Sequence, residues 1–160
     1  MTNFTDDGYC FVCGQNNPIG LKLDFAFDGR TIKTEYVPPK EHQGYKNIVH
    51  GGIVSALLDE VMVKVAIELG KPAVTAQMDI RLKKAVTTGT KISFSAEITH
   101  ETRKTLEAYA TATVNNEIVA DAKGKLVKIK INKGSRGPGA KGSSEKLSAF
   151  SDLHTAKAIS

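Results

Sequence analysis

Residues 50–70 read HGGIVSALLDEVMVKVAIELG, and this stretch decides the fold. Its apolar residues recur at helical spacing, and Gly70 supplies a stop, so the pattern predicts one long helix over residues 50–69. Three charged residues follow one another at four-residue steps and form one narrow stripe: Glu60, Lys64 and Glu68. Because nearly every other position is apolar, we expect the helix to be buried on most sides, with only this stripe reaching water.

The segments after the helix alternate between apolar and polar residues, which is typical of half-buried strands. The alternation runs through residues 74–82, 92–98 and 106–114, and we expect these three strands to form a meander. Asn115 and Asn116 then offer a hairpin turn into a last strand that begins at Ile118. In that strand the apolar positions change parity, which predicts a β-bulge near Gly124.

Before the helix, residues 21–27 and 31–36 read as two strands joined by a tight turn at Asp28-Gly29. A loop over residues 37–49 follows. The order of two strands, one long helix and further antiparallel strands indicates an α+β domain in which a curved sheet wraps the helix. This domain is expected to span residues 1–131, and the Gly-, Ser- and Lys-rich residues 132–160 to form a flexible basic tail without chemistry.

Composition excludes several classes of protein. The 160 residues carry a net charge of +5, which suits an anionic partner, but the chain has no Trp and few aromatic residues for base stacking, so nucleic acid is not expected. Charges interrupt even the most apolar segment, so no membrane span is predicted. The N-terminus lacks the pattern of a signal peptide and there are only two cysteines, which favours a soluble cytoplasmic protein.

Asp59 is the first candidate catalytic residue. It lies about 140° around the predicted helix from the centre of the charged stripe, among Ser55, Met62, Val63 and Ala66. An unpaired carboxylate is costly to bury, so its position on an apolar face predicts a wet crevice there. The alternative is an aspartate that is merely exposed or hydrogen bonded.

The start of the helix is the second candidate. His50, Gly51 and Gly52 stand where backbone N–H groups lack helical partners and the helix dipole is positive. Without side chains, the glycines let a substrate oxygen come close, so the N–H groups can act as an oxyanion hole for a thioester carbonyl. The alternative is an ordinary helix start with a structural histidine.

Several stretches together resemble the PaaI-like acyl-CoA thioesterases, a family with the hotdog fold. They are HGGIVSALLDEVM (50–62) with HQGYKNIV before it (42–49), CFVCGQNNPIGLKL (10–23), VTAQMDIRLKKAV (74–86) and ADAKGKLVK (120–128). The resemblance implies a thioester held between two protomers, with the His-Gly-Gly helix start from one and the acidic residue from the other. A homodimer is then the smallest active unit, and a homotetramer is equally compatible.

The same resemblance implies roles for single residues. Gly51 would donate its N–H to the carbonyl, His50 would help to position that carbonyl, and Asp59 would act as general base or as nucleophile. Thr75 matches a position where the family often has a hydroxyl that orients water, and Gln43 matches an upstream amide. Gly52 would line the substrate, and Glu60 is the fallback carboxylate.

Coenzyme A carries phosphates, and a basic cluster at the end of one strand is expected to bind them. Arg81, Lys83 and Lys84 form this cluster, with Arg103 and Lys104 in a later turn as further members of an anion-binding rim. The alternative is a solvated strand edge, because lysines also protect edges from unwanted pairing.

Cys10 and Cys13 have the spacing of half a zinc site, but the sequence shows no second pair of ligands at matching spacing. We therefore expect buried structural thiols and no metal.

The residues and the family resemblance together leave three functions open. The first is hydrolysis of acyl-CoA-type thioesters to free acid and thiol, with no metal or organic cofactor. The second is a non-catalytic acyl-CoA-binding or regulatory module on the same fold. The third, hydration of an enoyl thioester, fits less well because that branch of hotdog proteins usually presents a different pair of histidine and acidic residue. The identity of the acyl group stays open.

Overall fold

The computed structural model describes residues 4–130, and α1 (Gly51–Glu68) is its central element. His50 caps the helix, since its Nδ1 accepts a hydrogen bond of 2.8 Å from the backbone N–H of Gly52. At the other end Gly70 adopts a left-handed φ of 72°, which few other residues tolerate. The predicted helix is therefore confirmed. Seven of its residues are buried: Val54, Leu57, Leu58, Val61, Met62, Val65 and Ala66.

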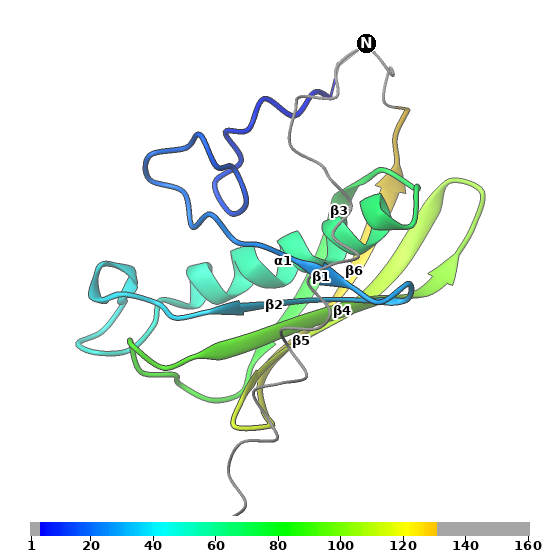
Figure 1. The fold of residues 1–160 in the computed structure, drawn as a ribbon. Coiled ribbons are helices and arrows are strands. Elements are labelled where there is room, and N and C mark those ends of the chain that lie inside the picture. Colours follow the sequence, from blue (N-terminus) through cyan, green and yellow to red (C-terminus); the bar gives the residue numbers. More distant parts are fainter. Residues whose placement is uncertain (1–3, 131–160) are drawn as a thin grey trace, which may run out of the picture.

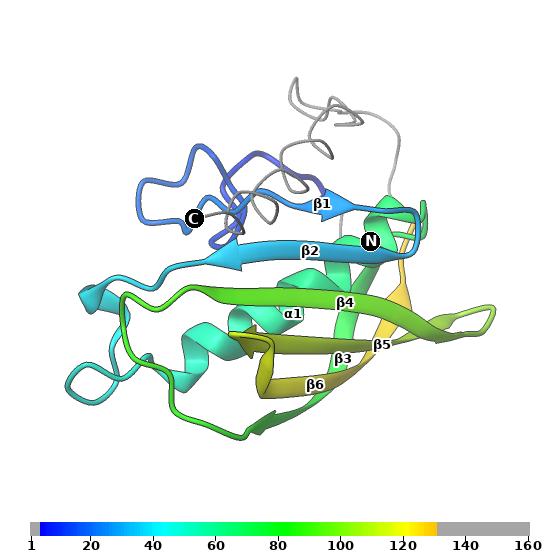
Figure 2. The ribbon, with the colours of Figure 1, turned by 60° about the horizontal axis from the view of Figure 1, so that its bottom comes forward.

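A six-stranded antiparallel sheet packs against the helix. Its strands are β1 (Ala26–Phe27), β2 (Thr31–Tyr36), β3 (Ala73–Leu82), β4 (Ile92–Glu101), β5 (Thr105–Val114) and β6 (Glu117–Lys128), and η1 (Lys40–His42) is a 3₁₀ turn before α1. The order across the sheet is β1-β2-β4-β5-β6-β3. Figure 1 shows α1 lying along one face of the curved sheet, and Figure 2 shows β1, β2, β4 and β5 side by side. The predicted α+β fold is confirmed.

Small residues on the central strands bring the helix close to the sheet. The core-facing positions of β5 and β6 include Ala108, Ala110, Ala112, Ala120, Ala122 and Gly124, and each is buried. Gly124 shows how tight the packing is, because a Cβ built there would lie 2.7 Å from Sδ of Met62. Met62 is itself fully buried, so the glycine makes room for a helix side chain.

The predicted parity change near Gly124 is wrong. Gly124 and Leu126 keep the same face toward the core, while Val127 is 39% exposed. Among the described residues the register shifts at three other places instead: between Thr75 and Gln77 in β3, between Ile98 and His100 in β4, and between Ala112 and Thr113 in β5. The last residue of the expected pattern, Ile131, lies outside the described residues, as do residues 132–160 of the predicted tail.

The predicted first strand, residues 21–27, is mostly not a strand. Lys22 has a positive φ of 54°, which interrupts an extended chain. The N–H groups of Leu21 and Leu23 donate to the carbonyls of Phe11 and Val12 rather than to a strand of the sheet. Only Ala26–Phe27 pair with β2, through the turn that the sequence predicted at Asp28-Gly29.

The expected meander is also arranged differently. β4, β5 and β6 are consecutive neighbours, whereas β3 pairs with β6 and forms the opposite edge of the sheet from β1. Residues 83–91 make this crossover possible, because they pass the loop before α1, where the N–H of Val49 donates to the carbonyl of Val86 over 2.9 Å. Alternation alone carries no information about which strands are neighbours.

The N-terminal segment lies against one side of α1 and covers part of the charged stripe. Glu60 and Lys64 expose only 15% and 21% of their side chains, and their ion pair spans 3.7 Å. Lys64 also lies 5.8 Å from the ring centroid of Phe25. The expectation that the whole stripe reaches water is therefore wrong, although Glu68 is exposed. Among residues 4–130, no helix is both long and apolar enough to cross a membrane.

Candidate active site

Asp59 and Thr75 meet at the junction of α1 and β3. The hydroxyl of Thr75 donates a hydrogen bond of 2.5 Å to Oδ1 of Asp59, and both residues are half-buried. Met62 and Ala66, on the same side of the helix, are buried. The carboxylate therefore has one oriented donor at the border between the core and the surface, and the wet crevice expected around it stays a prediction.

The start of α1 offers one free backbone donor. The N–H of Gly52 is already taken by Nδ1 of His50, whereas Gly51 at the first helical position has no acceptor within the helix. Leu82 packs at this point, so that a Cβ built on Gly51 would lie 2.7 Å from its Cδ1. The donor available to a substrate oxygen is thus Gly51, while His50 acts mainly as the helix cap.

The loop before α1 is held by contacts that the sequence did not reveal. The hydroxyl of Tyr36 lies 2.6 Å from Nδ1 of His42, and the carbonyl of His42 accepts the N–H of His50 over 2.8 Å. The side-chain oxygen of Gln43 accepts the N–H of Asn47 over 3.0 Å. Gln43 therefore shapes the loop that presents the helix start.

Gly51 and Asp59 are too far apart to act on one carbonyl within a single chain. They stand eight positions apart on one straight helix, which is about 12 Å along its axis. An oxyanion donor and an attacking carboxylate must reach the oxygen and the carbon of the same carbonyl, which are about 1.2 Å apart. If the carboxylate instead acts through a water molecule, the water adds about 3 Å to this separation. Gly51 and Asp59 are therefore two separate candidate half-sites of one chain.

The basic cluster is only partly available for an anion. Lys83 forms a salt bridge with Asp121, and Lys84 forms one with Glu117. Arg81 is exposed and has no acidic partner within salt-bridge distance among residues 4–130. Of the three predicted phosphate ligands, Arg81 is the one that the structure leaves unpaired.

The two other expected members of this rim lie elsewhere. The backbone carbonyl of Lys104 accepts a hydrogen bond from the N–H of Lys128. Lys128 in turn lies opposite Ala73, the first residue of β3, in the sheet. Arg81 stands near the far end of the same strand. Arg103 and Lys104 therefore sit at the opposite end of the sheet, and the prediction of one continuous rim is wrong.

Glu60 does not share the environment of Asp59. Its carboxylate oxygens lie 3.7 and 3.8 Å from Sγ of Cys10, beneath the N-terminal segment. Both cysteines are free and half-buried, and burial together with Glu60 raises the pKa of the Cys13 thiol to about 12. The fallback carboxylate thus belongs to a separate group of side chains.

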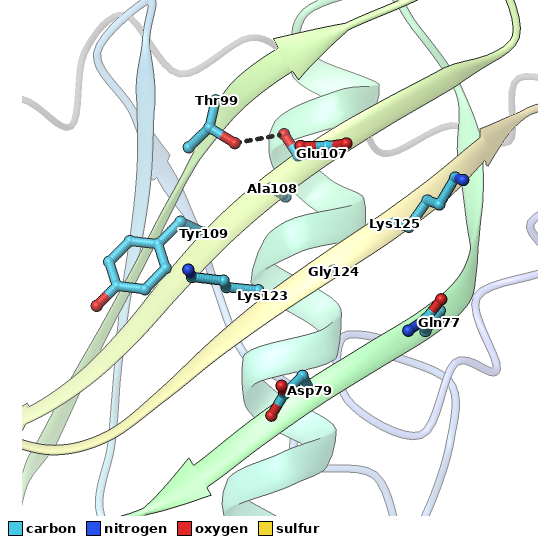
Figure 3. Close-up of a pocket in the computed structure, with 9 residues that line it drawn as sticks. All are labelled: Gln77, Asp79, Thr99, Glu107, Ala108, Tyr109, Lys123, Gly124 and Lys125. Carbon is cyan, nitrogen blue, oxygen red and sulfur yellow. Dashed lines mark hydrogen bonds between the residues drawn. The ribbon is translucent and has the colours of Figure 1, made fainter.

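A groove of about 480 Å³ lies on the face of the sheet that is turned away from α1 (Figure 3). Charged side chains of both signs line it, namely Asp79, Glu107, Lys123 and Lys125. Neither Asp59 nor Gly51 borders this groove. The groove is open to solvent, and it lies apart from the residues that the sequence singled out on α1.

Comparison with solved structures identifies the fold as the hotdog fold. A protein from Streptococcus pneumoniae TIGR4 that is described as a hypothetical thioesterase and was solved with coenzyme A is 20% identical. Its TM-score is 0.65, and the match covers 69% of this chain and 88% of that one. A Streptococcus mutans UA159 protein bound to acetyl CoA is 24% identical with a TM-score of 0.65, covering 69% and 91%. Thioesterase superfamily member 2 from Mus musculus is 18% identical with a TM-score of 0.61, covering 67% and 83%.

The sequence comparisons agree with the fold. The model of the thioesterase superfamily matches residues 46–119, which include both half-sites. A protein of Archaeoglobus fulgidus named "Putative esterase" is 31% identical over 99 residues, which are 61% of this chain and 64% of that protein. The chain thus spans 64% of the length of this curated relative. Residues 46–119 of the chain thus resemble the thioesterase superfamily.

Proposed function

We propose that the protein is a member of the thioesterase superfamily that hydrolyses acyl-CoA thioesters, and that it belongs with the PaaI-like enzymes. The observation that carries the proposal is the hydrogen bond between Thr75 and Asp59. The Gly51 N–H at the start of the same helix, which is free of helical partners, supports it. Two structural neighbours were solved with coenzyme A or acetyl CoA, which supports a ligand of this class.

In the proposed reaction the Gly51 N–H binds the thioester oxygen and stabilises the negative charge that develops on it. Asp59 removes a proton from water as the water adds to the carbonyl carbon. The C–S bond then breaks, and the thiol leaves with the proton held by Asp59. Direct attack by the Asp59 carboxylate, followed by hydrolysis of the anhydride, uses the same groups. No metal or organic cofactor takes part in either route.

Thr75 keeps the Asp59 carboxylate in one orientation and leaves its own oxygen free to accept from the attacking water. Two mutant structures of the Streptococcus pneumoniae protein give further support. One has an aspartate and the other a threonine replaced by alanine, and the threonine follows the aspartate by 16 positions. Asp59 and Thr75 have the same separation of 16 positions here.

The active unit in this proposal is at least a homodimer, in which Gly51 of one chain faces Asp59 of the other. The distance of about 12 Å between the half-sites of one chain requires such an arrangement if both act on one carbonyl. β3 forms one edge of the sheet and carries Thr75, so a second copy can approach there. A homotetramer built from two such dimers is equally compatible. The free thiols suit a reducing cytoplasm.

The second candidate function is acyl-CoA binding without hydrolysis. The observation that favours it is that His50, the nearest titratable side chain to the helix start, is engaged as a cap. Such a module would bind the same ligands at the same place and release no thiol.

The test is thiol release from short, long and aromatic acyl-CoAs by the wild type, by Asp59→Asn and by Asp79→Asn. Asp79 is an exposed aspartate on β3 that lines the outer groove, so it is a matched control for loss of charge. We expect Asp59→Asn to lower turnover about 10²- to 10⁴-fold and Asp79→Asn to leave it unchanged. Binding without any thiol release by the wild type would favour the second function.

A further inference from the structure

Three potential metal ligands converge where the N-terminal segment crosses α1. Sγ of Cys10, Sγ of Cys13 and a carboxylate oxygen of Glu60 all lie within 4.8 Å of one another. The cysteines alone are half of a site, and the third donor comes from the helix, 50 positions beyond Cys10. The hydrolytic mechanism uses none of these three groups.

The separations fit ligands of one small cation. Zinc lies about 2.3 Å from thiolate sulfur and about 2.0–2.2 Å from carboxylate oxygen, so at tetrahedral angles the sulfur and oxygen stand about 3.5 Å apart. The distances from Cys10 to the two oxygens of Glu60 are 3.7 and 3.8 Å. A shift of a few tenths of an ångström would bring these atoms to the coordination distance.

The turn that holds the two cysteines is already formed. The N–H of Gly14 donates to the carbonyl of Cys10 over 2.9 Å, and a Cβ built on Gly14 would lie only 2.4 Å from the Cys10 nitrogen. The N–H of Leu21 reaches back to Phe11 over 2.8 Å. Both sulfur atoms are therefore presented by a closed turn, so little chain ordering is needed when a metal binds.

The charges of the group balance with a divalent cation. Two thiolates and the Glu60 carboxylate contribute three negative charges, and Lys64, 3.7 Å from Glu60, contributes one positive charge. A cation of charge +2 makes this half-buried group neutral. Thiolate sulfur together with one carboxylate suits zinc better than magnesium or calcium, which prefer oxygen ligands.

We propose that Cys10, Cys13 and Glu60 bind one Zn²⁺ ion, with a water molecule as fourth ligand, and that the ion fastens the N-terminal segment to α1. Its role is structural. Asp59, the neighbouring residue on the helix, contacts β3 instead of this segment, so the ion stands apart from the proposed hydrolytic groups.

The test uses the full chain, freed of metal by a chelator and then titrated with Zn²⁺ or Co²⁺. We expect about one ion per chain and, for Co²⁺, the near-ultraviolet absorption of thiolate coordination. Glu60→Gln keeps the thiols and the packing of the side chain, and we expect it to weaken binding at least about 100-fold. Glu68→Gln, which changes an exposed acid of the same helix, is the matched control and should bind like the wild type.

Thermal unfolding gives a second measurement. Chelator should lower the unfolding temperature of the zinc-loaded wild type and leave that of Cys10→Ser/Cys13→Ser unchanged. Less than about 0.2 ions per chain in excess Zn²⁺, or equal affinity of the wild type and Glu60→Gln, would overturn the proposal. A Cys10–Cys13 disulfide in freshly purified protein would overturn it as well.

Discussion

Replacing Thr75 with valine removes one hydroxyl group from the proposed active site and keeps the shape of the side chain. The hydroxyl donates a hydrogen bond of 2.5 Å to Asp59, and the acceptor is a carboxylate. Hydrogen bonds to charged groups contribute about 1.5–3 kcal/mol. If this energy holds the carboxylate in its reactive orientation, Thr75→Val should lower kcat by about 10- to 150-fold.

The assay is thiol release from an acyl-CoA, with Thr75→Ser as the matched control. Serine retains the donor and loses only a methyl group from a half-buried edge position, so Thr75→Ser should keep most of the activity. Thermal unfolding of all three proteins separates loss of function from loss of structure. The reasoning is refuted if Thr75→Val turns over within about twofold of the wild type, or if Thr75→Ser is as impaired as Thr75→Val.

Three further predictions concern stability and ligand binding. Gly124→Ala should lower the free energy of unfolding by about 1–3 kcal/mol in urea titrations, because the Cβ of the alanine would overlap the buried Met62 side chain. A free energy of unfolding equal to that of the wild type would contradict this account of the packing. Arg81→Gln should raise KM for acyl-CoA more than Lys84→Gln, whose charge is already paired; equal KM values would count against this. Hydrogen bonds from two lysines lower the pKa of Glu101, so its ion pairs stabilise the fold above about pH 4.5. The difference in unfolding temperature between wild type and Glu101→Gln should shrink as the pH falls below that value and disappear once the pH is below the lowered pKa of Glu101. A constant difference would refute the assignment.

Local periodicity predicted the elements of this fold more reliably than their neighbours. The helix and the alternating strands follow directly from side-chain spacing, because each element buries one face. The position of β3 at the edge beyond β6 depends instead on where residues 83–91 cross, which is set by contacts such as Val49 with Val86. The short β1 depends on one positive φ at Lys22, a residue that gives no warning of such a conformation.

The candidate site was predictable where its residues lie on one element. Asp59 and Gly51 are read from the helix itself, and Thr75 from the family resemblance. Pairings between distant segments were not visible, such as Glu60 with Cys10 across 50 positions, or Lys83 with Asp121. For this reason the sequence suggested three free basic residues at the end of β3 and a solvated Glu60, whereas the structure shows most of these charges paired.

The central claim is that two chains together form a hydrolytic site, and a mixed dimer tests it most directly. Gly51→Ala places a methyl group at the carbonyl donor, and Asp59→Asn removes the base, so each homodimer should be nearly inactive. Dimers that contain one chain of each kind, isolated through two different tags, have one intact site of two. We predict that they release thiol from acyl-CoA at about half the rate of wild type. Mixed dimers as inactive as both parents would contradict a site shared between chains.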